Sequence, residues 1–179
     1  MRRKVAVLLY PGCIFFEVAL ATELLAKSFD VLFFTPDGMQ HLASNGSVLQ
    51  AFGSYADLES LEVACVLIPG GDPGSIIPQN TATQCLQAAS ARGSVMAGIC
   101  AGNLVLASAG LLRGVRATHN YTLEHATPEA VQATESFWEG IVFERADTVV
   151  DGRFITAQPW ACVKFAAAVA RSLDAVKCP

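Results

Sequence analysis

The sequence predicts an α/β fold in which helices cover both sides of a mostly parallel sheet. Short continuous apolar runs alternate along the chain with helical patterns, and strands buried on both faces consist of such runs. Of the 179 residues, 53% are hydrophobic and only 16% are charged, which provides for a closed core and excludes a disordered chain. No repeat, low-complexity stretch or long linker interrupts residues 1–179, so we expect one domain.

The first half of the chain is expected to contain three strands, one helix and a small β excursion. Pro36-Asp37-Gly38 and Asn45-Gly46 are turn signals before and within a short extended pattern, which predicts a hairpin there. Pro69-Gly70-Gly71 ends the third strand. In order, the expected elements are a strand over residues 5–9, a helix over 16–27, a strand over 31–34, the β excursion over 40–49 and a strand over 63–68.

The second half continues the alternation and ends in an amphipathic helix. This last helix places Cys162, Phe165, Val169 and Leu173 on one face, which is the spacing of a stripe that packs on a core. The expected elements are a helix over residues 76–91, a strand over 94–99, a helix after Cys100, short β segments over 116–118, 142–150 and 154–157, and a helix over 161–173. Ligands of such folds bind at the carboxyl ends of the parallel strands.

Charge and cysteine content limit the partners and cofactors. Twelve Lys and Arg against sixteen Asp and Glu give a net charge of −4, so no basic excess is present to neutralise nucleic acid. Six cysteines occur without a C-x-x-C pair or a His at ligand spacing. We therefore expect no nucleic-acid partner, no metal site, and free thiols in a reducing cytosol.

Two apolar stretches resemble targeting or membrane signals. Residues 1–21 carry basic residues ahead of an apolar run, but Pro11-Gly12 and Glu17 are out of place in a secretory signal. Residues 93–112 lack charge, yet Gly, Ser and Asn103 dilute the run, and its pattern changes across Cys100 from strand-like to helical. We expect no membrane partner and a cytoplasmic location.

Cys100 has the surroundings of a nucleophile. Gly98-Ile99-Cys100-Ala101-Gly102 has the small-residue spacing of a nucleophile elbow at a predicted strand-to-helix junction. The helix dipole and the amides that begin the helix favour the thiolate, so we expect a thiol pKa below its ordinary value, and the Ala101 amide is a candidate oxyanion donor. The alternative is a buried, inert cysteine, and the spacing favours neither.

Glu17 is unusual because it shares a helical stripe with four apolar residues, Leu20, Ala21, Leu24 and Leu25. A carboxyl on a buried stripe is costly to ionise, so its pKa should rise and the neutral acid should donate a hydrogen bond. The alternative is a surface carboxylate in the first turn, where it complements the helix dipole.

Two further candidates are a glycine pair and a histidine. Gly70 and Gly71 follow a buried strand and allow backbone amides to approach a bound oxygen, although such a pair also serves as a plain turn. His119 ends a short strand and is a candidate acid or base, although a lone His is more often structural.

Four ordered segments, taken with Glu17, resemble the DJ-one (ThiJ/PfpI) superfamily, which is class I glutamine amidotransferase-like. The segments are Ile68-Pro69-Gly70-Gly71, Ala97-Gly98-Ile99-Cys100-Ala101-Gly102, Gly110-Leu111-Leu112 and Arg116-Ala117-Thr118-His119. The resemblance spans essentially the whole chain. It implies a flavodoxin-like three-layer sandwich and a homodimer. It also implies that Cys100 is the reactive thiol, that Glu17 is its protonated partner with His119 nearby, and that the amides of Gly71 and Ala101 bind an oxyanion.

The branch within the superfamily is suggested by the residues around the cysteine. PfpI-type peptidases carry His after the nucleophile, where this sequence has Ala101. Isocyanide-hydratase relatives usually have Asp near the Glu17 position and Thr after the cysteine, and both are missing here. Cys-Ala-Gly followed by Thr-His looks closest to the branch with glyoxalase III and deglycase activity. Asn103 stands where that branch has Pro, and Gln158-Pro159-Trp160 replaces its Gly-Pro-Gly.

Together these features predict a cofactor-free enzyme that acts on small reactive carbonyls through a Cys100 thiolate, without metal or glutathione. One alternative is a redox sensor or chaperone that works by oxidation of Cys100 without turnover. Another is an intracellular peptidase or amidase of the PfpI type. A ligand-binding domain of a transcription regulator is disfavoured, because the sequence shows no helix-turn-helix segment or basic patch.

Overall fold

A seven-stranded sheet lies at the centre of residues 2–175, the part of the chain that the structure, a computed structural model, describes. From edge to edge its strands are β10 (Thr148–Asp151), β11 (Phe154–Ala157), β7 (Val95–Ile99), β6 (Cys65–Ile68), β1 (Lys4–Leu8), β2 (Asp30–Thr35) and β5 (Gly53–Ser54). Neighbouring strands pair in parallel except β10 with β11. The predicted, mostly parallel sheet is confirmed.

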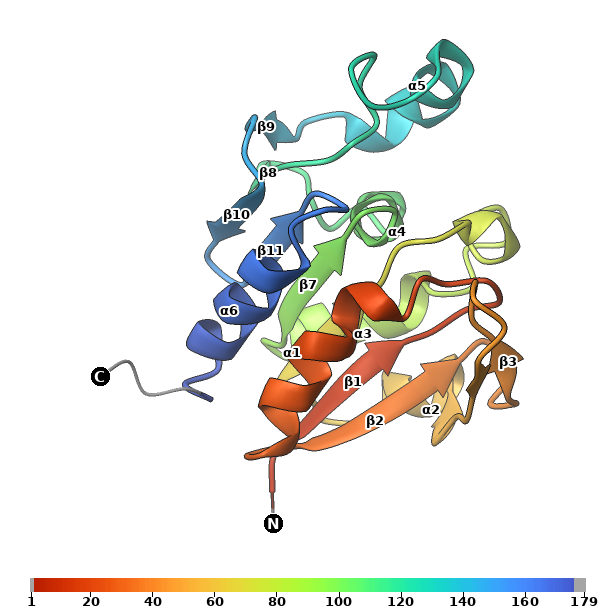
Figure 1. The fold of residues 1–179 in the computed structure, drawn as a ribbon, viewed down its shortest axis with the longest axis vertical. Coiled ribbons are helices and arrows are strands. Elements are labelled where there is room, and N and C mark those ends of the chain that lie inside the picture. The colour runs from red at the N-terminus through yellow and green to blue at the C-terminus, as the bar shows by residue number, and fades with distance from the viewer. Residues whose placement is uncertain (1, 176–179) are drawn as a thin grey trace.

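Helices cover both faces of this sheet and give three layers. Figure 1 shows α1 and α6 packed side by side in front of the sheet, with α2 and α3 behind it. The helices are α1 (Phe16–Ala26), α2 (Tyr55–Glu59), α3 (Thr83–Ala91), α4 (Gly102–Ser108), α5 (Pro128–Thr134) and α6 (Cys162–Ser172), with short 3₁₀ turns η1 (Pro73–Ser75) and η2 (Glu135–Trp138). This is the flavodoxin-like α/β sandwich that the resemblance implied.

The central strands supply most of the core because both of their faces are covered. Every residue of β6 and β7 is buried, and in β1 only Lys4 reaches solvent. Phe165 and Val169 on α6, and Leu173 directly after its end, are buried as the predicted stripe requires, and Cys162 is half-buried. Burying apolar side chains is the main favourable contribution to folding, so this layer stabilises the sheet edge where the site lies.

Two small β pairs lie outside the main sheet. The predicted excursion forms an antiparallel hairpin of β3 (His41–Leu42) and β4 (Val48–Leu49). The predicted segments 116–118 and 142–150 contribute β8 (Arg116–Ala117) and β9 (Val142–Phe143), which pair in parallel. Residues 144–147 of the second segment are irregular, and β10 begins at Thr148.

Some elements differ from the sequence-based expectation. The helix expected over residues 76–91 begins only at Thr83, because Pro78 disfavours helical backbone before it and Asn80 adopts a left-handed φ of 54°. Helix α2 was not predicted, although Ser54 and Asp57 form a capping box at its start. Helix α5 was also missed, although Thr127 caps it and Pro128 follows.

The uncharged run over residues 93–112 folds as β7, a turn and α4, as predicted. Among residues 2–175, no helix combines the length and apolar character needed to cross a membrane. Cys13, Cys65, Cys85, Cys100 and Cys162 carry free thiols, and Cys178 lies outside the described residues.

Candidate active site

The turn between β7 and α4 holds Cys100 in a strained conformation. Its φ is 58°, in the left-handed region of backbone conformation. A residue other than glycine stays in this region only where the surrounding structure holds it there. The Cys100 N–H donates to the Ala157 carbonyl of β11 at 3.0 Å. A Cβ on Gly102 would lie 2.1 Å from the Ile68 carbonyl oxygen, so only glycine fits there. The G-x-C-x-G spacing predicted a sharp turn from strand to helix at Cys100, and the structure has this turn.

Glu17 and Cys100 meet at Gly70, although they come from α1 and from the turn after β7. The Gly70 N–H, just past β6, donates to Glu17 Oε2 at 2.6 Å. A Cβ on Gly70 would lie 2.5 Å from that oxygen and 2.6 Å from the sulfur of Cys100. The Glu17 carboxyl and the Cys100 thiol also share a side-chain hydrogen bond. The missing side chain at Gly70 is what lets acid and thiol approach each other.

The Glu17 side chain lies inside the protein and not on its surface. Glu17 is 4% exposed, and burial raises the pKa of its carboxyl, while the hydrogen bonds with Gly70 and Cys100 act in the opposite direction. In its neutral form the carboxyl can donate its proton in the hydrogen bond that it shares with Cys100. The buried alternative for Glu17 is therefore the one that the structure contains.

The pKa of the Cys100 thiol departs from the sequence-based expectation. Burial raises this pKa to about 12, and a negative charge on Glu17 adds to the rise, whereas hydrogen bonds from the Ala101 and Gly71 amides lower it. The expectation of a lowered thiol pKa was wrong for this state, because the loss of solvent outweighs the two amides. When Glu17 carries its proton, its negative charge no longer repels a thiolate at Cys100. The Glu17–Cys100 pair therefore favours one negative charge over two.

Two backbone amides converge on the Cys100 sulfur. They belong to Ala101, in the elbow itself, and to Gly71, in the loop after β6. Gly71 has a φ of 122°, and a Cβ there would lie 2.8 Å from the Cys13 Cα and the Gly12 carbonyl oxygen. The close packing of the Gly12–Cys13 loop thus requires glycine at position 71. Such a pair of amides can stabilise an oxyanion that forms beside the sulfur.

His119 lies at the same edge of the sheet, but its ring is engaged elsewhere. The ring stacks on Trp138 with centroids 3.9 Å apart, and Nδ1 accepts from the Tyr121 N–H at 3.2 Å. Burial lowers the pKa of His119 to about 4, so it is neutral at neutral pH with its proton on Nε2. In residues 2–175, no hydrogen bond joins the ring to Cys100 or Glu17. In this state His119 is a donor through Nε2, and its Nδ1 lone pair is already used.

Two buried amides tie the end of β11 to the elbow and to the His119 segment. Asn103 Nδ2 donates at 2.8 Å to the Ala157 carbonyl, which also accepts the Cys100 N–H. Gln158 Nε2 donates to Thr118 Oγ1 at 2.7 Å and to the His119 carbonyl at 3.0 Å. In the sequence, both amides stood out only as differences from the branch with glyoxalase III and deglycase activity. A polar Asn inside an apolar run was the available signal for the first.

Tyr121 is a further neighbour of the thiol that the sequence did not single out. Burial raises the pKa of its phenol to about 12, and negative charge at Cys100 and at Asp72 adds to this rise. Tyr121 comes from an irregular loop, where no periodicity points to it. Trp160 is half exposed at the surface, and its Nε1 donates to Asp147 Oδ1 at 2.9 Å. Among residues 2–175, no three His, Cys, Asp or Glu side chains cluster as metal ligands.

Comparisons with known proteins agree with this fold and site. The model of the DJ-1/PfpI family matches residues 3–172. Isonitrile hydratase of Pseudomonas putida is 31% identical over 58% of this chain, and the chain spans about half (49%) of that protein's length. Among solved structures, a DJ-1 superfamily protein from Agrobacterium tumefaciens has a TM-score of 0.81 at 24% identity, with 98% of this chain and 92% of that chain covered. Drosophila melanogaster DJ-1beta has a TM-score of 0.80 at 24% identity and the same coverage. The two structural matches show the fold.

Proposed function

Because the chain belongs to the DJ-1/PfpI family, we propose that it is a cysteine-dependent enzyme of the hydratase type, with Cys100 as nucleophile and small reactive carbonyls as substrates. One observation carries the proposal. The Cys100 sulfur lies in a strained elbow, against a buried carboxyl and two amides. A nucleophile, a proton carrier and an oxyanion site within reach of one atom are the requirements for adding a thiol and then water to a carbonyl.

In the proposed reaction the side chains and amides of this chain act on the substrate together with one water molecule. The sulfur forms a bond to the aldehyde carbon of a 2-oxoaldehyde, and the carbonyl oxygen becomes an oxyanion that accepts from the amides of Gly71 and Ala101. In this scheme Glu17 donates its proton to that oxygen. As a carboxylate it then moves the proton from the first to the second carbon, which converts the hemithioacetal to a thioester. Water then cleaves the carbon–sulfur bond. The product is a 2-hydroxy acid, equal to substrate plus water, and the thiol is restored.

His119 is proposed as a donor in this scheme. Its neutral ring holds the Nε2 proton while Nδ1 accepts from Tyr121, so it is suited to hydrogen-bond a substrate oxygen and unsuited to abstract a proton.

The test is consumption of methylglyoxal by the purified chain, with the product identified by nuclear magnetic resonance. We expect multiple turnovers, a loss of at least about a thousandfold in Cys100→Ser, and normal turnover in the control Cys162→Ser, a half-buried thiol outside the site. Retention of the activity in a folded Cys100→Ser variant would refute the proposal. Peroxide oxidation confined to Cys100 without any turnover would instead support the sensor alternative.

A second candidate reaction is favoured by one comparison, the 31% identity to isonitrile hydratase. Here the sulfur would add to the terminal carbon of the isonitrile while Glu17 supplies a proton, which gives a thioimidate. Water would then add to the same carbon, and loss of the sulfur would release an N-substituted formamide. Assays of an alkyl isonitrile and methylglyoxal side by side separate the candidates, because Cys100 is required in both and only the preferred substrate turns over.

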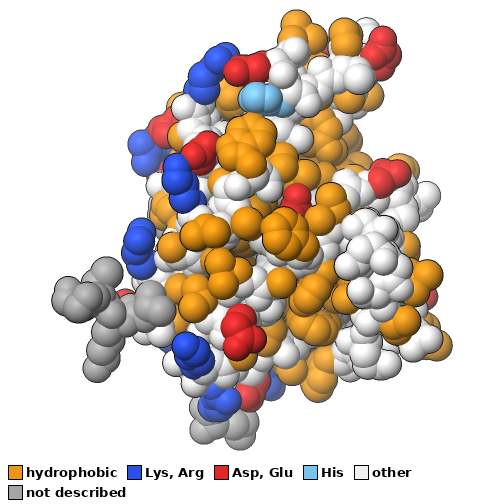
Figure 2. Space-filling model, in the orientation of Figure 1, with side chains coloured by type: hydrophobic (Ala, Val, Ile, Leu, Met, Phe, Trp, Pro, Cys, Tyr) orange, Lys and Arg blue, Asp and Glu red, His pale blue; other side chains and the backbone are white. Residues whose placement is uncertain are grey.

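We also propose that the chain forms a homodimer through the face that α1 and α6 share. Figure 2 shows hydrophobic side chains gathered over the middle of this face. Phe16 and Leu20 on α1, Val163 on α6 and the neighbouring Trp160 are exposed apolar residues in this region. An apolar patch of this kind marks a protein contact more often than free surface. Light scattering should give twice the chain mass, and Phe16→Glu combined with Val163→Glu should give a monomer.

A further inference from the structure

A pocket of about 630 Å³ opens at the amino edge of the sheet, where strands β1, β6 and β7 begin. This is the opposite edge from Cys100, which follows the carboxyl end of β7. The pocket is larger than the solvent gaps of a packed core and falls within the range of small-molecule sites. It has no part in the proposed carbonyl chemistry.

The rim of this pocket concentrates positive charge on a chain that is negative as a whole. Four of its lining residues are cationic, namely Arg2, Arg3, Lys4 and Arg92, and one, Glu62, is anionic. Helices α3 and α6 end at the pocket, and each contributes about half a negative charge. The remaining balance is still about two positive charges, against −4 for the whole sequence. This local excess is what an anionic ligand requires.

Within the described residues, three of the four cations have no carboxylate partner. Arg2 pairs with Asp30, but within residues 2–175 no ion pair involves Arg3, Lys4 or Arg92. Arg3 donates one N–H to the Leu173 carbonyl at 3.1 Å, and Arg92 donates to the Leu58 and Leu61 carbonyls. These backbone bonds orient the two guanidinium groups and leave other N–H donors and the full charge of each group available.

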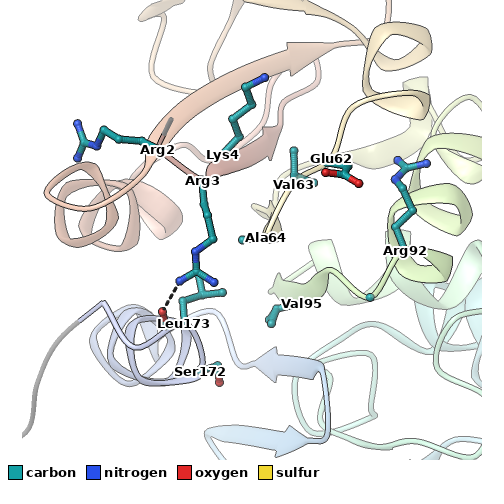
Figure 3. A pocket seen from close by; sticks show the side chains of 11 residues that line it. Arg2, Arg3, Lys4, Glu62, Val63, Ala64, Arg92, Val95, Ser172 and Leu173 are labelled. Atoms are coloured by element: carbon teal, nitrogen blue, oxygen red, sulfur yellow. Dashed lines mark hydrogen bonds between the residues drawn. The ribbon is translucent and has the colours of Figure 1, made fainter.

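The floor of the pocket is apolar. Figure 3 shows Val63, Ala64 and Val95 lying between Arg3 on one side and Arg92 on the other. An apolar floor inside a cationic rim suits a ligand with an anionic head and an apolar or planar body. Guanidinium groups recognise phosphate oxygens through paired N–H donors, and Lys4 adds a point charge.

We propose that this pocket binds a small organic phosphate, whose phosphate group lies on the Arg92 side of the rim, in the combined positive field of Arg3 and Lys4, and whose organic part lies on Val63, Ala64 and Val95. The site is separate from the Cys100 centre and does not depend on the proposed function.

The experiment is calorimetric titration of the full chain with phenyl phosphate, inorganic phosphate and benzyl alcohol at one fixed ionic strength. We expect one phenyl phosphate per chain, binding about tenfold weaker for inorganic phosphate because it lacks the apolar ring, and no binding of the uncharged alcohol. Lys4→Gln combined with Arg92→Gln should weaken phenyl phosphate binding at least about tenfold.

The matched control is Arg113→Gln combined with Arg145→Gln, which removes the same two positive charges from exposed side chains that neither line the pocket nor adjoin a residue that lines it. Binding by this control and by Cys100→Ser should stay within about twofold of the original chain, since neither change touches the pocket. Equal weakening in pocket and control variants, or loss of binding in Cys100→Ser, would overturn the proposal. Single Lys4→Gln serves if the double variant does not fold, because the Lys4 side chain makes no hydrogen bond that the fold needs.

Discussion

The two edges of the central sheet are built in opposite ways. At the carboxyl edge, backbone amides, glycines and one buried acid pack closely around Cys100, whose side chain stays half-buried. At the amino edge, long cationic side chains surround an open pocket with an apolar floor. The parallel sheet explains the contrast, because all its crossover turns from strand to helix, and hence all free helix amides, lie at one edge.

The contrast teaches where this protein tolerates change. Backbone groups packed around the thiol cannot move without moving a strand or a helix, whereas flexible side chains at the amino edge adjust to a substitution. We therefore expect comparable substitutions to cost much more at the carboxyl edge.

The largest expected effect comes from adding one methyl group at each edge. Gly102→Ala would place a Cβ 2.1 Å from the Ile68 carbonyl oxygen, whereas Gly93→Ala, which lines the amino-edge pocket, would meet nothing within 4 Å. We expect Gly102→Ala to lower the free energy of unfolding by more than about 3 kcal/mol. Gly93→Ala should cost about 1 kcal/mol, because its φ of 93° is unfavourable for a side chain. Urea unfolding of both variants measures the difference, and equal costs would break the comparison.

A second effect comes from the buried histidine at the carboxyl edge. Burial lowers the pKa of His119 from 6.5 to about 4, so on acidification the unfolded chain takes up a proton that the folded chain refuses. The folded state should lose up to about 3 kcal/mol as the pH falls from about 6.5 to about 4. His119→Gln should lack this part of the acid sensitivity. The test is to measure the free energy of unfolding in urea at about pH 7 and about pH 4.5 for both chains. An equal loss in the original chain and in the variant would show that the His119 ring is solvated.

Glu17 should act on stability in the opposite direction. Because burial raises the pKa of its carboxyl, the folded chain keeps a proton that the unfolded chain releases above its ordinary pKa, and stability falls as the pH rises through that window. Glu17→Gln removes this penalty, so the variant should gain stability relative to the original chain between acid and neutral pH. Thermal unfolding across that range is the measurement. A gain that shrinks with rising pH would mean that Glu17 is ionised at little cost.

The smallest effect is expected at the amino edge. Arg92→Gln removes the hydrogen bonds to the Leu58 and Leu61 carbonyls, but the Leu58 carbonyl still accepts from the Leu61 N–H at 3.1 Å, and the lost bond to Leu61 lies at the surface. We expect a loss of about 1 kcal/mol or less in the free energy of unfolding, with unchanged alkylation of Cys100. A cost near that of Gly102→Ala would show that the amino edge is as rigid as the carboxyl edge.

Much of the carboxyl edge was predictable because its signals are local. The spacing of small residues around Cys100 marked the elbow, whereas the apolar stripe around Glu17 left a buried acid and a surface carboxylate both open. The pKa of the Cys100 thiol was not predictable, because its rise depends on how much protein covers the sulfur. The late start of α3 and the turn of helix at α2 were missed where single residues, Asn80 and Ser54, outweigh the average pattern.

By itself, the sequence determined the α/β class, the order of most strands and helices and the identity of the elbow, because apolar periodicity and turn residues act over a few neighbours. The tertiary structure alone decided that Glu17 meets Cys100 at Gly70 and that Arg3, Lys4 and Arg92 surround one pocket. These groups are far apart along the chain, and only the packing of strands and helices against each other sets the distances between them.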